Sequence, residues 1–325
     1  MTAVAALTGG SGFIGSRVLE RLQAEGWHVR ALSRSTPARR SACVTWVRGD
    51  LNDSGVAEEL VTGADAVVHC AGTVAAVGEA GFIRGNTDAT RRVVQAAAAQ
   101  GTRPRIIVLS SLAARYPALS AYARSKRLAE EAVTAHAGET PYTILRPTAV
   151  YGPGDRALAP VFRMLSRGWL VMPGPRAARL SFLHVDDLVQ AIGTGLTTPV
   201  APRGCFEIDD GTDGGYTWQA IAAAAERAYG RRVRRLPIPA SGLYAVAGVN
   251  QALARLIGYR PMLAPDKVRE LRCDDWRCSN RAYRELTGWR PRLTLADAML
   301  QGRLGIEADI VAQRGSRPYW GAGNE

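Results

Sequence analysis

A tyrosine and a lysine four residues apart have the chemistry to move a proton. Tyr122 and Lys126 bound the run YARSK at 122–126, and an i, i+4 spacing places two side chains on one face of a helix. A free tyrosine, with a pKa of about 10, is a poor base at neutral pH, but a nearby ammonium group favours the phenolate and lowers that pKa. We therefore expect Tyr122 to act as a general acid or base that Lys126 tunes.

A Tyr/Lys pair on an arbitrary helix is usually surface decoration, so its place in the chain matters. Only one other lysine, Lys267, occurs in the 325 residues, and the pair follows an apolar run at 106–109 that ends in Ser110 and Ser111. A serine hydroxyl at the end of a strand can hydrogen-bond a carbonyl or an alcohol, although it can equally cap a turn. We favour Ser111 over Ser110 as the third catalytic residue.

The first apolar run of the chain ends in a glycine-rich turn. Residues 8–15 read TGGSGFIG, with an apolar run before them and a helical pattern after them. Glycine permits the tight turn and the close approach of backbone to a pyrophosphate, whose charge then lies at the positive N-terminus of a helix. In this context the pattern predicts a dinucleotide site. The expected contacts are Gly9, Gly12, Phe13, Ile14 and Gly15.

The end of the second expected strand indicates which dinucleotide binds. NAD sites usually place an acid there, to hold the ribose hydroxyls. This chain has Ser33 and Arg34 instead, with Arg39 and Arg40 nearby and no carboxylate close by in the sequence. Arginine pairs with a 2′-phosphate through charge-assisted hydrogen bonds. We therefore expect NADP(H), while a solvated arginine beside an NAD(H) site remains the alternative.

Two further strand ends have residues suited to the cofactor. Asp50 and Leu51 follow the third expected strand, where a carboxylate can accept a hydrogen bond from the adenine amino group; a turn aspartate is the ordinary alternative. Ala71 and Gly72 follow the fourth strand, and their small side chains leave room for a ligand at the carboxyl edge of a parallel sheet.

Strands and helices alternate along the first half of the chain. Apolar runs predict strands at 4–7, 28–33, 44–47, 66–70, 106–109 and 142–145, and helical patterns lie at 13–24, 86–100 and 120–137. Beyond Pro147 the pattern weakens, and we expect helices at 185–194, 217–229 and 295–304 and a strand at 205–208. Such alternation predicts an α/β fold with a doubly wound parallel Rossmann sheet. We assign 1–150 to this dinucleotide-binding domain, 151–313 to a mixed region that partly returns to the sheet and partly forms a smaller C-terminal substrate-binding lobe, and 314–325 to a loose tail.

Composition narrows the class of protein. The net charge of +12 comes from scattered arginines, which do not form the clusters typical of nucleic-acid binding. The five cysteines include no CxxC pair, so we expect neither disulfides nor a metal site, and a cytoplasmic location. No apolar run reaches the length of about 18–20 residues that a membrane span needs. The nearest approach, 240–252, fits a surface helix as well as it fits membrane contact.

Together these motifs resemble the short-chain dehydrogenase/reductase superfamily, over nearly the whole chain. The resemblance rests on TGGSGFIG at 8–15, GDL at 49–51, VVHCAG at 67–72, Asn86, Ser110 and Ser111, the pair Tyr122 and Lys126, and RPTAVYGPGD at 146–155. The run SFLHVDDLVQAI at 181–192 is typical of the extended, epimerase/dehydratase-like branch.

The resemblance implies a role for each motif residue. Tyr122 would be the general acid or base, Lys126 would also bind the nicotinamide ribose, and Ser111 would polarise the reacting oxygen. Pro147 and Thr148 would line the nicotinamide face. Asn86 would order the helix beside the site; Asn86 and Tyr151 are also candidates for substrate contact. His184 and Asp186 would be structural. We also expect a homodimer formed through the helices that carry Asn86 and Tyr122.

Three departures from the sugar-modifying members argue against a nucleotide sugar. The interval from Ser111 to Tyr122 is short, Leu180 stands where those enzymes commonly have a diphosphate-binding arginine, and Leu112 and Ala113 replace an acidic pair. The leading hypothesis is therefore an NADP-dependent ketone or aldehyde reductase, or alcohol dehydrogenase, similar to the dihydroflavonol reductase and 3β-hydroxysteroid dehydrogenase groups. The alternatives are a nucleotide-sugar epimerase or dehydratase with tightly bound NAD(P), and a non-enzymatic redox sensor.

Overall fold

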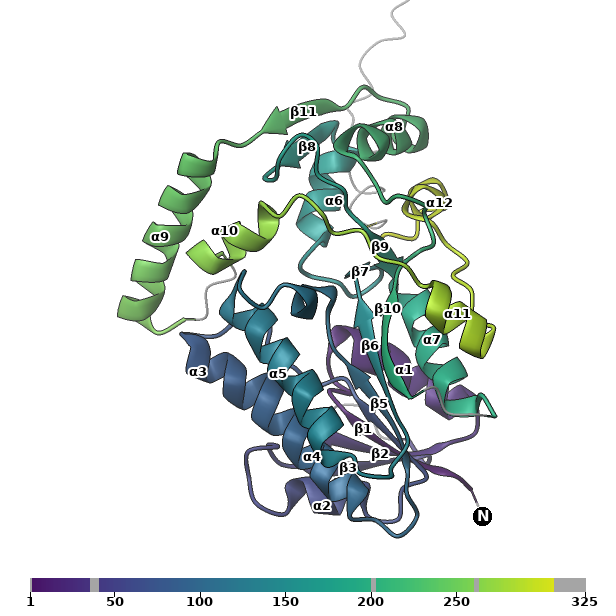
Figure 1. The fold of residues 1–325 in the computed structure, drawn as a ribbon. Coiled ribbons are helices and arrows are strands. Elements are labelled where there is room, and N and C mark those ends of the chain that lie inside the picture. Colours follow the sequence, from purple (N-terminus) through teal and green to yellow (C-terminus); the bar gives the residue numbers. More distant parts are fainter. Residues whose placement is uncertain (1, 36–40, 200–202, 260–262, 307–325) are drawn as a thin grey trace, which may run out of the picture.

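The protein is built around one parallel β-sheet (Figure 1). The structure, a computed structural model, describes residues 2–35, 41–199, 203–259 and 263–306. Seven strands lie in the order β10-β6-β5-β4-β1-β2-β3, and every neighbouring pair is parallel. Their bounds are β1 Val4–Thr8, β2 His28–Ser33, β3 Val44–Arg48, β4 Ala66–His69, β5 Arg105–Leu109, β6 Tyr142–Pro147 and β10 Gly204–Ile208. The predicted Rossmann fold class is confirmed.

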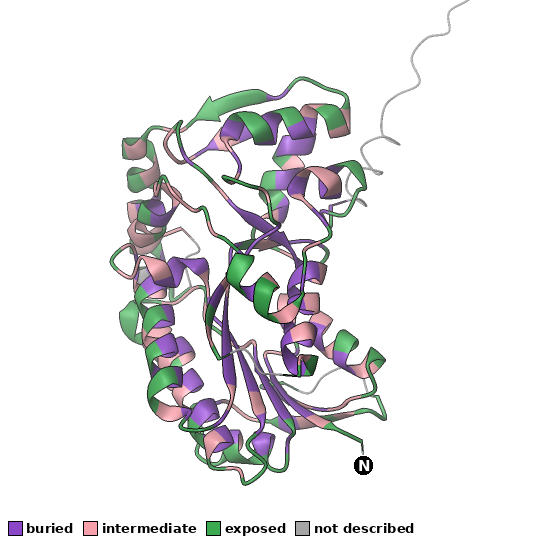
Figure 2. Cartoon of the chain, turned by 45° about the vertical axis from the view of Figure 1, so that its right-hand side comes forward, coloured by how far each residue is buried: buried purple, intermediate pink, exposed green. Residues whose placement is uncertain are grey.

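Helices cover both faces of this sheet because successive strand side chains point to opposite faces. On β5, Ile107 faces the helices α1, Phe13–Ala24, and α7, Val185–Thr197. Its neighbour Ile106 faces the other layer, which consists of α2 Val56–Val61, α4 Ala89–Ala98 and α5 Ala121–His136. Figure 2 shows the strands buried and the outer faces of the helices exposed. The near-continuous apolar runs of the strands follow from this double burial.

The helix expected at 86–100 begins earlier than its apolar pattern. A short helix α3, Glu79–Phe82, and a π-helical turn, Ile83–Asp88, lead directly into α4. The π-turn carries Asn86, whose side chain bonds to backbone outside the helix. π-turns interrupt the α-helical period and often occur at functional sites, which explains why a 3.6-residue pattern missed this start.

The second lobe has its own apolar core and several elements that the sequence did not indicate. Its members are β7 Ala149–Tyr151, α6 Ala159–Ser166, β8 Trp169–Met172, β9 Phe182–His184, α8 Trp218–Tyr229, β11 Arg234–Pro237, α9 Ala240–Ile257, α10 Pro265–Leu271 and α12 Leu295–Leu300. Helix α11, Arg281–Thr287, instead packs on the main sheet, where Tyr283 contacts Phe206 of β10. β7 pairs with β9, and β8 pairs with β11. Short strands in pairs carry too little periodicity to be recognised from single sequences.

Three expectations from the sequence concern a membrane span, the cysteines and the C-terminal tail. No helix in the described ranges combines the length and the apolar character that crossing a membrane requires. All five cysteines are free thiols in the structure. The expected loose tail at 314–325 lies outside the described residues.

Candidate functional site

The glycine turn between β1 and α1 forms a cradle that side chains would fill. A Cβ on Gly9 would lie 2.8 Å from the backbone nitrogen of Ala71, and one on Gly15 would lie 2.0 Å from the carbonyl oxygen of Gly9. Gly12 caps α1 without a side-chain hydrogen bond, and the first turn has no acid. The free N–H groups of this helix end therefore suit an anion such as a pyrophosphate.

The expected adenosine side of the site is polar at the end of β2. Ser33 is buried, and its Oγ donates to the carbonyl oxygen of Ser35 at 2.7 Å, while Arg34 is exposed. Arg39 and Arg40 lie outside the described residues. Asp50 Oδ1 is held within its own turn by Asn52 N and Nδ2, at 2.9 and 2.6 Å, and the Leu51 side chain is buried in the core.

Lys126 lies at the carboxyl edge of the sheet. Its Nζ donates to the carbonyl oxygen of Leu109, the last residue of β5, at 3.0 Å. A Cβ on Gly72, in the loop after β4, would lie 3.1 Å from this ammonium group, so a larger residue there would crowd Lys126. Burial lowers the pKa of Lys126 to about 8, although the charge of Glu130 opposes this shift. The side chain is thus both positioned and close to its titration range near neutral pH.

The pKa of Tyr122 differs from the one expected from the sequence. Burial raises its pKa to about 12, a hydrogen bond with Ser111 lowers it, and the charge of Glu270 raises it further. The predicted lowering of this pKa by Lys126 is wrong for the structure, because burial dominates and the ammonium group is engaged by the Leu109 carbonyl. At neutral pH the phenol is therefore protonated and can donate a proton.

The two serines at the end of β5 have different partners. Ser110 Oγ donates to Glu130 Oε1, which also accepts from Arg146 Nε at 2.8 Å. Ser111 bonds to Tyr122 and also accepts from the backbone nitrogen of Ala113. Because Ser110 is committed to a buried ion pair, the geometry favours Ser111 as the partner of the tyrosine.

Asn86 is a buried residue whose amide group is fully engaged within the protein. It is only 1% exposed, and its Oδ1 accepts from Thr73 N at 2.8 Å. Its Nδ2 donates to Thr73 O and to Ser125 Oγ, at 3.0 and 2.9 Å. These bonds join the loop after β4 to the helix that carries Tyr122 and Lys126. They support the ordering role that the resemblance implied and correct the candidate substrate contact.

Two candidate residues after β6, Thr148 and Tyr151, lie in different surroundings. Thr148 is largely buried, and its Oγ1 has no hydrogen-bond partner among the described residues, which fits an added polar ligand beside Pro147. Tyr151, in contrast, is completely buried against Phe162, Phe182 and His184. Its candidate role in substrate contact is therefore corrected to one in the core of the second lobe.

A buried hydrogen-bond chain under the glycine turn had no signal in the sequence. His69 Nδ1 lies 2.8 Å from Thr8 Oγ1, and its Nε2 lies 3.0 Å from Thr90 Oγ1. Burial lowers the pKa of His69 to about 3, so the imidazole is neutral. Thr8 Oγ1 in turn accepts from the backbone nitrogen of Ala71. The chain fixes β1, β4 and α4 relative to one another beneath the cradle.

The second missed feature is the contact between α10 and the start of the catalytic helix. Ser120 caps α5 through Ala123 N, and its Oγ donates to Glu270 Oε1. Lys267 Nζ donates to the other oxygen of Glu270 at 2.6 Å. The sequence pairs Lys267 with Glu270 at i, i+3 but gives no indication that they meet a helix 150 residues earlier.

The histidine and the aspartate of the 181–192 motif are structural. His184 is completely buried; its Nε2 lies 3.0 Å from Arg303 O, and its Nδ1 accepts from Asp186 N. Asp186 accepts from Arg303 Nη2 at 2.8 Å. The pair ties α7 to the segment after α12, in agreement with the role that the resemblance implied.

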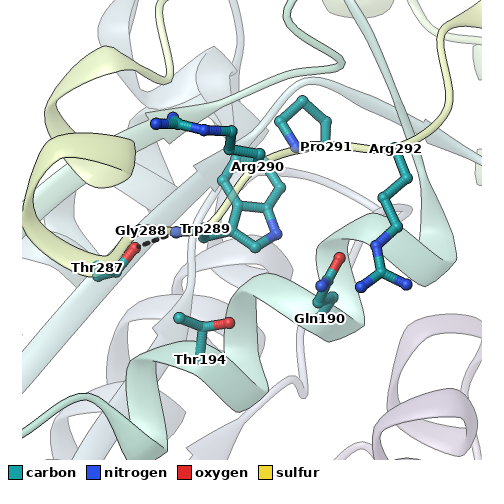
Figure 3. A pocket seen from close by; sticks show the side chains of 8 residues that line it. All are labelled: Gln190, Thr194, Thr287, Gly288, Trp289, Arg290, Pro291 and Arg292. Atoms are coloured by element: carbon teal, nitrogen blue, oxygen red, sulfur yellow. Dashed lines mark hydrogen bonds between the residues drawn. The ribbon is translucent and has the colours of Figure 1, made fainter.

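One surface hollow of about 380 Å³ lies apart from these groups. It is lined by Gln190 and Thr194 of α7 and by residues 287–292, which follow one another across its far side (Figure 3). Thr287 Oγ1 accepts from Trp289 N at 3.2 Å and shapes this turn. None of the expected catalytic or cofactor residues lines it, so we assign it no part in the site.

The site as a whole has the elements of acid–base chemistry on a bound dinucleotide. A protonated phenol and a serine hydroxyl bond to each other, an ammonium group lies at the end of β5, and an anion cradle lies at the end of β1, with β4 between the two strands. Open α/β sheets bind ligands at this carboxyl edge, where the strand order reverses between β1 and β4.

Comparisons with known proteins agree with this geometry. Residues 5–205 match the family model described as the NAD dependent epimerase/dehydratase family. A ceramide reductase of Caulobacter vibrioides (strain NA1000 / CB15N) is 35% identical over 276 residues, which cover 84% of this chain and 85% of that protein. A 2-alkyl-3-oxoalkanoate reductase of Stenotrophomonas maltophilia (strain K279a) is 28% identical over 207 residues, 57% of this chain and 62% of that protein.

Solved structures share the fold at lower identity. MoeE5 in complex with UDP-glucuronic acid and NAD has a TM-score of 0.70 at 21% identity and covers 96% of this chain and 100% of its own. A UDP-glucuronic acid 4-epimerase from Bacillus cereus has a TM-score of 0.69 at 17% identity, with 96% and 100% coverage. The family match, which spans more than half of the chain, together with the glycine cradle and the Rossmann sheet, places this protein in the NAD-dependent epimerase/dehydratase family, the extended branch of the short-chain dehydrogenases/reductases.

Proposed function

We propose that this protein is an NADP(H)-dependent reductase of a ketone, with Tyr122 as the proton donor. NADPH, when bound, supplies a hydride to the carbonyl carbon. Ser111 donates to the carbonyl oxygen and orients it, and Tyr122 transfers its proton to that oxygen as charge develops there. Lys126 holds the nicotinamide ribose from its place at the Leu109 carbonyl. Gly9, Gly12 and Gly15 hold the pyrophosphate, and Arg34 faces the 2′-phosphate.

The observation that carries this proposal is the hydrogen bond between Ser111 and a protonated Tyr122. Tyr122 stays protonated at neutral pH and so holds the proton that a carbonyl reduction requires. The similarity to a ceramide reductase over most of both chains also supports a reduction as the reaction of this protein. We therefore propose a long-chain lipid ketone as the substrate class, and a cytoplasmic homodimer formed through the faces of α4 and α5 as the working form.

A nucleotide-sugar epimerase is the second candidate, because the solved neighbours include such enzymes. Their identities of 17–21% support the fold alone. Leu180 still leaves this chain without an arginine at the usual diphosphate position, and Leu112 and Ala113 offer no acidic pair. The reductase assignment accounts for these residues, and the epimerase assignment does not.

The test is NADPH oxidation by the purified chain, with a keto-ceramide, short-chain ketones and UDP-sugars as substrates. We expect oxidation with the lipid ketone, slower oxidation with NADH, and none with UDP-sugars. Tyr122→Phe should keep NADPH affinity and lose at least about 100-fold in kcat, the usual contribution of a general acid. Tyr116→Phe is a matched control, because Tyr116 lies beside Trp276 and outside the site. Full activity of Tyr122→Phe would refute the assignment, and turnover of a UDP-sugar would favour the epimerase.

A further inference from the structure

Helix α9 turns its apolar side chains to solvent. Val246, Val249, Leu253 and Leu256 follow a helical spacing along one face, and Val249 and Leu256 are 62% and 82% exposed. The opposite face is buried through small residues, Ala247 and Ala254. This pattern is the reverse of an ordinary surface helix, whose apolar stripe faces the core. A contiguous exposed apolar stripe marks an interaction surface.

The segment that leads into α9 is strongly basic, and it departs from the scattered distribution of arginines expected from the sequence. Arg231, Arg232, Arg234 and Arg235 are all exposed, and none forms an ion pair within the described residues. Arg234 lies over the ring of Trp169, on the neighbouring strand β8. No aspartate or glutamate occurs between Glu226 and Asp266 in the sequence. Figure 2 shows β11 exposed along its length, next to α9 in the chain.

The exposed apolar face and the arginines together indicate what kind of partner binds this surface. An exposed apolar helix face, preceded in the chain by exposed arginines and a partly exposed tryptophan, matches the acyl and headgroup layers of an anionic bilayer. Around a two-fold axis between two copies of this chain, the same arginines would meet one another and repel. Charge complementarity therefore favours a lipid surface over a second copy.

We propose that α9 and β11 form a peripheral docking surface for an anionic membrane, with α9 lying in the plane of the headgroups. This inference rests on the proposed lipid ketone substrate, which resides in such a membrane. The contact is close to the chemistry: α9 packs on α10, and Glu270 of α10 bonds to Ser120 at the start of the helix that carries Tyr122. Docking would thus bring the helix that carries Tyr122 and Lys126 close to the lipid surface.

Vesicle flotation of the full chain tests the surface without catalysis. We expect binding to vesicles of phosphatidylcholine with phosphatidylglycerol and little binding to phosphatidylcholine alone. Val249→Glu with Leu253→Glu, or Arg232→Gln with Arg235→Gln, should weaken binding about tenfold or more. The matched control is Leu286→Glu with Leu300→Glu, which changes comparably exposed leucines on α11 and α12 and should leave binding intact. All variants should reduce a short water-soluble ketone at the wild-type rate.

Two results would overturn the membrane surface. One is a wild-type chain that does not float with anionic vesicles at low salt. The other is an α9 variant that changes the oligomeric state while the wild type binds no vesicles, which would identify the face as an interface between copies. A wild type that floats but reduces no ketone would instead refute the proposed reaction and leave the membrane contact standing.

Discussion

At the scale of single residues, the ionisation of Lys126 should control the pH dependence of cofactor use. Its pKa is lowered to about 8, so the ammonium form is present below that pH and is lost above it. We expect kcat/KM for NADPH, which reports the free enzyme, to fall as the pH rises through about 8. Lys126→Arg, which stays charged, should show a lower plateau without this fall. A profile for the wild type that stays level to pH 10 would contradict the assignment.

Glu270 should act on the tyrosine through its charge. Its carboxylate raises the pKa of Tyr122, so Glu270→Gln should lower that pKa. In the direction of alcohol oxidation, which needs the phenolate as a base, we expect the pH profile to shift to lower pH by up to about one unit. Asp266→Asn is the control, because Asp266 accepts from Ala121 N at 3.3 Å and is not a cause of the raised tyrosine pKa. Coincident profiles for Glu270→Gln and the wild type would show that the charge of Glu270 does not act on Tyr122.

At the scale of elements, the packing of α1 on β1 depends on Gly15. An added Cβ would lie 2.0 Å from the Gly9 carbonyl, so Gly15→Ala must displace the turn or the helix. We expect a cost of about 1–3 kcal/mol in the free energy of unfolding and the loss of measurable NADPH binding in a fluorescence titration. Gly101→Ala is the control, because no atom lies within 4 Å of a Cβ there. Wild-type affinity in Gly15→Ala would show that the cradle does not hold the dinucleotide.

The same scale shows why some elements were predictable from sequence. The helix at 13–24 and the strand at 28–33 were predicted with the bounds that the structure has, because a buried strand or a capped amphipathic helix leaves its own pattern in the residues it contains. β8 and β11 have four residues each and form a separate two-stranded sheet, and β11 is exposed along its length. Their pairing depends on partners far away in the chain, and no local period encodes it.

At the scale of the whole molecule, the sequence predicted those site residues that a local motif identifies, and it missed the properties that depend on tertiary packing. The Tyr122 and Lys126 spacing placed both on α5, but the direction of the tyrosine pKa was missed, since burial and Glu270 come from tertiary packing. Tyr151 was misassigned for the same reason: a tyrosine in the loop-like run VYGPG gives no sign that three aromatic rings enclose it.

The chain order of the site has a consequence for how such an enzyme diversifies. Every residue proposed to hold the dinucleotide lies at or before Thr148, whereas the elements with α9, α10 and the second apolar core come after it. Under the proposed function, the reducing agent and its target would be held by separate stretches of one polypeptide. Recombination or drift in the later stretch can retarget the molecule to a new ketone while the machinery for delivering the hydride is inherited unchanged.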